Sequence, residues 1–265
     1  MEKARTALDG FGLTTLAVKP IVAHATITNE KGLSPLPDGE LYYAPLATFF
    51  APAATPLAQV PAAFNLGAVA HALGHEAIEE LVWKGAVLPA PELAAGNDAA
   101  TISARHVSRS MAEGISDYLG VSVADDPRWF DHSLQQDAST RALDSTHCGT
   151  PDMLSALSVD DAQAPYDPYP LGSVIASCLW DEGSATTNQN TAKGVLQALP
   201  ALGSLTASGL SLAVILDTLA ANSPDEQRSD LCGILVNRFA PLQITVADLP
   251  TCGAITIVDH EECSQ

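Results

Sequence analysis

The spacing of hydrophobic residues changes near Phe64. Over residues 1–62, short apolar groups are separated by Pro, Gly and Asn, which favours short strands and irregular structure. Leu41–Tyr43 and Ala47–Ala51 are expected to form edge strands, and the three prolines of Pro52–Pro61 predict an extended loop. The front of the chain is therefore predicted to contain β-structure.

Beyond Phe64 the apolar residues recur at helical intervals. Asn65–Lys84 contains no proline, and its apolar positions are spaced by four residues, which predicts a helix. Asp98–Leu119 is a second predicted helix, capped by Asp98 or Thr101, and Gly172–Trp180 is a third. The Ala/Leu-rich region 190–240 is expected to form two or three helices, broken at Pro200 and at Ser223-Pro224.

Together these patterns predict an α+β fold built from two subdomains. The first, residues 1–125, combines the β-containing front with the two central helices. The second, residues 126–265, is predicted to be mainly helical after an irregular, polar insertion at 126–168.

Composition narrows the classes of function. The 265 residues are 47% hydrophobic and 16% charged, which excludes a disordered chain. The net charge of −19 repels phosphate backbones and anionic lipids, so neither nucleic acid nor a membrane surface is an expected partner. The most apolar stretch, Leu210–Leu216, ends at Asp217 and is too short to span a membrane.

Five cysteines are present, and none forms a CxxC pair, which excludes a cysteine zinc knuckle. Three of them fall near the C-terminus, which fits either a disulfide that ties down the tail of an exported protein or buried thiols. The first residues lack the apolar core of a secretory signal, as expected of a cytoplasmic protein or of a mature exported chain. Of these, a secreted or periplasmic location is the one we predict.

The most informative segment for chemistry is Val69-Ala70-His71-Ala72-Leu73-Gly74-His75-Glu76. His71 and His75 are four residues apart on a predicted helix, so both imidazoles lie on one face and can reach one metal ion. Two histidines at this spacing also occur by chance on a helix face. The other histidines His24, His106 and His132 have no partner at ligand spacing and are expected at the surface or at helix caps.

A second segment, Glu113-Gly114-Ile115-Ser116-Asp117, lies in the second predicted helix. Glu113 can supply a third ligand, which would give a His₂Glu set with one open position. Asp117, one turn further along, can accept a hydrogen bond from a ligand imidazole and fix its tautomer.

These segments resemble the zinc-binding motifs of the gluzincin metallopeptidases of the thermolysin and fungalysin type. Asn65–His75 is similar to the fungalysin segment NGVVAHEYGH, Ala112–Tyr118 to GEGWSDF, and Pro168–Asp181 to VHxxGEVWAxxLWD, in the same order. The resemblance implies a thermolysin-like (zincin-like) fold, zinc ligation by His71, His75 and Glu113, and peptide hydrolysis. It also implies that Asp117 positions His71.

The chain departs from this family pattern at three positions. Ala72 occupies the position of the glutamate that serves as general base, and alanine cannot accept a proton. Tyr169 replaces the histidine that stabilises the oxyanion, although its hydroxyl could donate one hydrogen bond. Ala112 stands where a polar residue is often found. Glu76 lies a full turn beyond Ala72 and is interpreted as a surface residue rather than a substitute base.

Three hypotheses follow. The first is a zinc metallopeptidase, silenced by Ala72, that acts on peptides or proteins and pairs an extended substrate with an edge strand around Leu41–Phe50. The second is a natural pseudopeptidase that keeps zinc and serves as a peptide- or protein-binding module. The third is a metal-free scaffold with accidental motifs. The sequence leaves open whether Ala72 arose by engineering or by natural divergence.

Overall fold

The computed structural model describes residues 2–13, 19–22, 33–36, 40–43, 65–84, 96, 98–132, 138–185, 188–205, 209–260 and 263. Within them the protein is mainly helical. The predicted α+β, thermolysin-like fold is therefore wrong. Helices dominate the first 125 residues as well, and the described strands are only four residues long each. The expected strand Ala47–Ala51 and loop Pro52–Pro61 fall outside the described residues.

The three short strands form one small sheet with the order β1-β3-β2. Strand β1 (Lys19–Val22) is parallel to β3 (Glu40–Tyr43), and β2 (Leu33–Leu36) is antiparallel to β3 on its other side. The prediction that Leu41–Tyr43 is an edge strand is wrong, because β3 is hydrogen-bonded on both sides. These residues cannot pair with an extended substrate without displacing a neighbouring strand.

Two long helices form the centre of the molecule, and both begin at side-chain caps. Helix α3 (Leu66–Leu81) begins where the Asn65 side chain accepts a hydrogen bond from the Ala68 backbone, and α5 (Ala99–Ala124) begins at Asp98, which accepts one from Thr101. Such caps satisfy amide groups that the first turn leaves free. Both predicted helices are confirmed. Helix α1 (Glu2–Gly10), which the sequence pattern did not reveal, packs against α3 through buried Ala4 and Leu8.

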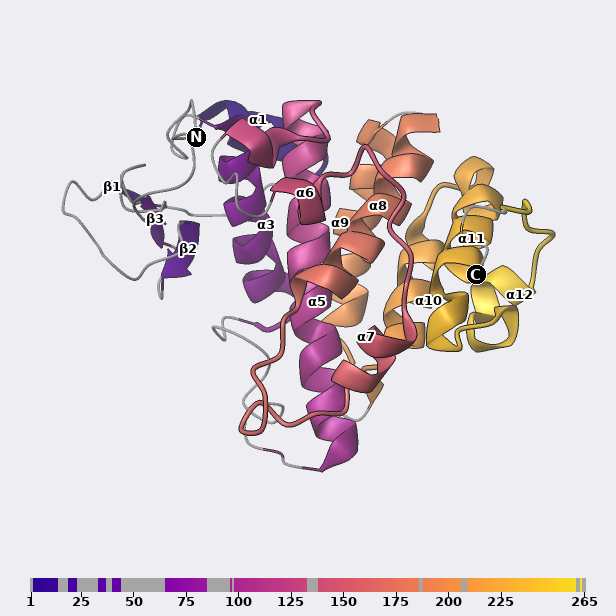
Figure 1. The fold of residues 1–265 in the computed structure, drawn as a ribbon. Coiled ribbons are helices and arrows are strands. Elements are labelled where there is room, and N and C mark those ends of the chain that lie inside the picture. Colours follow the sequence, from indigo (N-terminus) through magenta and orange to yellow (C-terminus); the bar gives the residue numbers. More distant parts are fainter. Residues whose placement is uncertain are drawn as a thin grey trace.

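Helix α5 is the middle of the fold (Figure 1), with α3 and the sheet on one side and the later helices on the other. Beyond α5 lie α8 (Tyr169–Ala185) and α9 (Asn188–Leu202), and then α10 (Leu212–Asn222) and α11 (Asp225–Phe239). The predicted break at Ser223-Pro224 is confirmed, whereas Pro200 lies inside α9. The shorter helical elements are η2 (Trp129–His132), α6 (Ala138–Arg141), α7 (Pro151–Ala156), η4 (Ala240–Leu242), η5 (Val246–Asp248) and α12 (Pro250–Gly253).

Glycines allow α5 to approach its neighbours closely. A Cβ atom on Gly114 of α5 would lie 2.5 Å from the carbonyl oxygen of Gly172 in α8. A Cβ atom on Gly74 of α3 would lie 3.0 Å from the Cα atom of Ser116 in α5. Larger side chains at these crossings would push the helices apart. The two crossings hold the functional faces of α3, α5 and the start of α8 next to one another.

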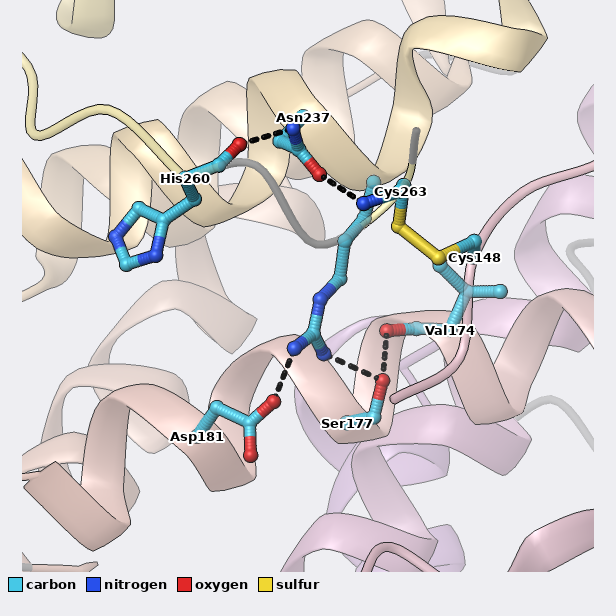
Figure 2. The surroundings of a disulfide bond; sticks show 8 residues. Cys148, Val174, Ser177, Asp181, Asn237, His260 and Cys263 are labelled. Atoms are coloured by element: carbon cyan, nitrogen blue, oxygen red, sulfur yellow. Dashed lines mark hydrogen bonds and ion pairs between the residues drawn. A yellow bond between two sulfur atoms is a disulfide. The ribbon is translucent and has the colours of Figure 1, made fainter. Parts of the chain in front are cut away.

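Two disulfides hold the C-terminal region. Cys148 pairs with Cys263, and Cys232 pairs with Cys252, while Cys178 is buried in α8. Figure 2 shows that the tail is also held by Asn237, whose amide donates to the carbonyl oxygen of His260 and accepts from the Cys263 backbone at 3.1 Å. Of the two interpretations of the cysteines, the structure supports the disulfide-bonded one. None of the described helices is long and apolar enough to cross a membrane.

Candidate metal centre

The centre lies where α3 crosses α5. His71 and His75 are one helical turn apart on α3, and Glu113 and Asp117 are one turn apart on α5. The close approach at Gly74 brings the two pairs together, so the sequence-predicted site residues meet in space. His71 is 9% exposed, and the side chains of His75 and Glu113 are 16% and 18% exposed.

Three donor atoms face one another across this crossing. The Nε2 atoms of His71 and His75 are 3.1 Å apart, and Glu113 Oε2 lies 3.8 Å from the first and 3.6 Å from the second. Ligand atoms about 2.0–2.2 Å from a tetrahedral zinc ion lie roughly 3.3–3.6 Å from each other. The observed separations are close to this range. The described residues therefore contain a candidate metal-binding triad of His71, His75 and Glu113.

Asp117 lies behind the first of these histidines. Its Oδ1 atom is 2.8 Å from Nδ1 of His71, and the Asp117 side chain is almost fully buried. A carboxylate at this position keeps the proton on Nδ1 and leaves Nε2 free to bind a metal ion. Burial also lowers the pKa of His71, although Asp117 acts to raise it. The imidazole is thus held in the neutral form that metal ligation requires.

Arg141, which the sequence interpretation did not single out, completes the centre. Its guanidinium donates from Nε to Asp117 Oδ2 at 2.9 Å and from Nη2 to Glu113 Oε2 at 3.2 Å, with a further bond to Asp117 Oδ1. The side chain is buried, and its Cζ atom lies 4.2 Å from the ring centres of both Phe130 and Tyr169. Arg141 therefore links the two carboxylates of α5 to the start of α8.

The charges in this cluster depend on one another. Burial would raise the pKa of Glu113, but His75, Arg141 and His71 together hold it below its usual range. Burial would lower the pKa of Arg141, but Asp117 and Glu113 raise it above its usual value. Glu113 is therefore a carboxylate and Arg141 a guanidinium at neutral pH. Before any metal ion binds, the arginine supplies the positive charge that keeps two acidic groups in a buried site.

The other predicted positions have different environments. Ala72 is buried, with 1% of its surface exposed, and contributes no polar group. Tyr169 reaches the centre through its contact with Arg141. Glu76 is 6% exposed, so its interpretation as a surface residue is wrong, and burial raises its pKa to about 7. Glu76 is not among the three candidate ligand residues and lies one helical turn beyond Ala72 on α3.

No sequence motif pointed to Arg141 as part of the site. The only available signal was indirect: two acidic residues on the buried face of a helix need a cation nearby.

Trp129 and Phe130 form an aromatic wall beside the candidate ligands. Their ring centres lie 5.7 Å and 6.2 Å from the centre of the His71 ring. An apolar wall lowers the local polarity and strengthens the interactions inside the site.

Chemically, this arrangement presents two imidazoles and one carboxylate to a common point, with a supporting carboxylate and a fixed arginine. That donor set suits a divalent transition metal such as zinc. A scan against protein-family models and searches of curated proteins and of solved structures found no match for this chain.

Proposed function

We propose that His71, His75 and Glu113 hold a zinc ion in a site of the metallopeptidase type. The proposal rests on the site and not on the fold, since the expected α+β architecture is wrong. The observation that carries it is the set of donor-atom separations, 3.1, 3.6 and 3.8 Å, together with Asp117 at 2.8 Å from the far nitrogen of His71. Zinc in such a site polarises a peptide carbonyl and lowers the pKa of bound water.

The residues around the metal ligands have separate roles in this proposal. Asp117 fixes the orientation and tautomer of His71. Arg141 holds Asp117 and Glu113 in place. Tyr169, which packs on Arg141, is the residue that we propose to donate a hydrogen bond to a substrate oxygen.

The general base is the missing component. In the family pattern Ala72 occupies its position and cannot take a proton from water, and Glu76 lies a full helical turn further along α3. Loss of a general base lowers the rate by about 10²–10⁴-fold. We therefore propose that the protein is a zinc metallopeptidase silenced at position 72, whose partners are peptides or proteins.

A second function, a natural zinc-containing module that binds peptides or proteins without cleaving them, is favoured by the burial of Ala72. A glutamate at a position with 1% exposure would place a carboxylate among core residues. A site that evolved without hydrolysis has no need to accommodate one. Both functions use the zinc site. They differ in whether a glutamate at position 72 could act as a general base.

Elemental analysis tests the zinc site. Protein purified without added metal is expected to contain about one zinc per chain, and His71→Ala should lose it. His132→Ala is the matched control, because His132 is an exposed histidine paired with Asp126, outside the cluster. Absence of zinc from the unmodified protein, even after incubation with zinc, would refute the proposal.

Peptidase assays on Ala72→Glu and Ala72→Gln distinguish the two functions. Both variants bury a side chain of the same size, but only glutamate can act as a base. Activity in Ala72→Glu alone, with zinc retained in both, supports the silenced peptidase. Two inactive, folded, zinc-loaded variants support the binding module.

A secreted or periplasmic location is part of the proposal. It is supported by the two disulfides, Cys148–Cys263 and Cys232–Cys252, because disulfides persist mainly in oxidising compartments. A peptide substrate or partner would be met in the same compartment.

A further inference from the structure

A cavity of about 410 Å³ lies outside the metal centre, between α7, the segment that follows it and the first turn of α8. Its lining is mainly apolar and includes Met153, Ala156, Val159, Pro165, Pro170 and Leu171. Cavities of this size and character are typical of sites for small molecules. Nothing in the proposed zinc chemistry uses this cavity.

One wall of the cavity is fixed by a polar cluster around Asp161. Arg109 donates to its carboxylate at 3.2 Å, Arg105 lies 3.6 Å from it, and the Tyr166 backbone donates to it at 2.9 Å. These contacts fasten the segment that carries Val159, Pro165 and Tyr166 to helix α5. The wall is therefore formed before any ligand arrives, which reduces the entropy cost of binding.

The ring of Tyr166, which lines the cavity, is fixed as well. It stacks on His106 with ring centres 4.1 Å apart, and its hydroxyl lies 2.8 Å from Ser110 Oγ. His106 is fully buried, so the expectation of a surface or capping histidine is wrong. An immobilised aromatic ring offers a ligand a flat apolar surface at little entropic cost.

The rim of the cavity carries negative charge. Asp152 and Asp167 line it, both residues are exposed, and in the described part of the chain neither forms an ion pair with a basic side chain. Asp167 Oδ1 accepts a hydrogen bond from the Tyr169 backbone, which holds the carboxylate beside the cavity. Arg109, the cation near Tyr166, is already paired with Asp161. The rim is thus suited to a cation.

We propose that this cavity binds a small apolar molecule that carries a positively charged amine. The apolar part enters between α7 and α8, where it is removed from water, and the ammonium group stays at the rim near Asp152 and Asp167. The proposal does not depend on the zinc site.

Binding of 2-phenylethylamine, measured by ligand-observed NMR and calorimetry on the full chain, tests this proposal. We expect a Kd of roughly 0.1–1 mM for a ligand of this size. Two probes of similar shape serve as controls, the neutral 2-phenylethanol and the anionic 3-phenylpropanoate. The amine should bind about three- to tenfold more tightly than the alcohol, and the carboxylate should bind least.

Variants locate the site. Asp152→Asn and Asp167→Asn should each weaken amine binding about threefold and leave the alcohol unchanged, whereas Asp259→Asn, at an exposed aspartate of the tail, should change neither. Ala156→Phe should fill the cavity and weaken binding of both probes at least tenfold. The two asparagine variants alter exposed side chains, so they test the site even if Ala156→Phe fails to fold.

Any of three results would overturn the proposal. The first is the absence of amine binding at about 10 mM in the unmodified protein, well above the expected Kd. The second is equal binding of amine, alcohol and carboxylate. The third is amine binding that is unaffected by all three cavity variants.

Discussion

The Nδ1 atom of His71 lies 2.8 Å from the Oδ1 atom of Asp117, and this contact joins α3 to α5 at the candidate metal centre. The same carboxylate also accepts hydrogen bonds from Arg141. One buried carboxylate thus contacts a candidate metal ligand and is itself neutralised by a guanidinium. We therefore expect the stability of the fold and any metal affinity of the site to be linked through Asp117.

Replacing Asp117 by Asn should lower zinc affinity about 10- to 100-fold, because the neutral amide no longer holds the proton on His71 Nδ1. Competition with a coloured chelator measures the change. Asp131→Asn, which alters a partner of exposed Arg128, is the control and should leave the affinity unchanged. An unaltered affinity in Asp117→Asn would show that the contact does not support the metal.

Arg141→Gln should lower the free energy of unfolding of the metal-free protein by about 3–5 kcal/mol, because it leaves Asp117 and Glu113 buried without their cation. Arg141→Lys should lower the free energy of unfolding by less, since lysine keeps the positive charge but cannot contact both carboxylates as the guanidinium does. Urea unfolding measures both. Arg128→Gln removes an exposed arginine that is also paired with two aspartates, and it should cost at most about 1 kcal/mol. Equal losses at positions 141 and 128 would contradict this prediction.

The contribution of Glu182 to the stability of the protein should fall as the pH rises from about 4.5 to 7. Burial raises the pKa of Glu182 from its ordinary 4.5 to about 7, while Thr191 donates a hydrogen bond to the carboxyl. The folded chain then holds this proton to a higher pH than the unfolded chain, so deprotonation favours unfolding. The contribution is roughly 3 kcal/mol at most.

Glu182→Gln removes this titration. The free energy of unfolding of both proteins is measured with denaturant at several pH values. The value for Glu182→Gln should rise relative to that of the unmodified protein as the pH increases from 5 to about 8. Gln in place of the exposed Glu2 is the control variant. Parallel profiles for Glu182→Gln and the unmodified protein would refute a buried, protonated carboxyl at neutral pH.

The two disulfides should differ in their contribution to stability. Cys148–Cys263 spans 115 residues and Cys232–Cys252 spans 20. The longer loop restricts the unfolded chain more, so the Cys148→Ser/Cys263→Ser double variant should lose about 1–2 kcal/mol more than Cys232→Ser/Cys252→Ser. Unfolding in urea measures both. A larger loss for the shorter loop would show that native contacts outweigh loop entropy here.

The sequence pattern predicted the central helices well because their signals are local. Asn65 and Asp98 cap α3 and α5, and the apolar spacing of both helices is set within single turns. The fold class was wrong because short apolar groups between prolines in the front of the chain suggested more β-structure than the described residues contain. The position of β3 between two strands depends on pairing partners that no local pattern identifies.

The triad was predictable for the same local reason. His71 and His75 share a face by helical spacing, and so do Glu113 and Asp117, which leaves only the meeting of two faces to be inferred. Arg141 and the polar cluster around Asp161 were not predictable in this way. Their ion-pair partners lie 24 to 56 residues away along the chain, and they come together only through packing.

The sequence alone thus determined which residues are candidate metal ligands and which helices carry them, because spacing along a helix fixes side-chain direction. It also determined that position 72 has no base, which follows from the chemistry of alanine. The tertiary structure decided the rest. The close approaches at Gly74 and Gly114 set the separations of the ligand atoms, Arg141 became the cation of the centre, and Glu76 was buried rather than exposed. Each of these depends on contacts between segments distant in sequence, which local propensity does not encode.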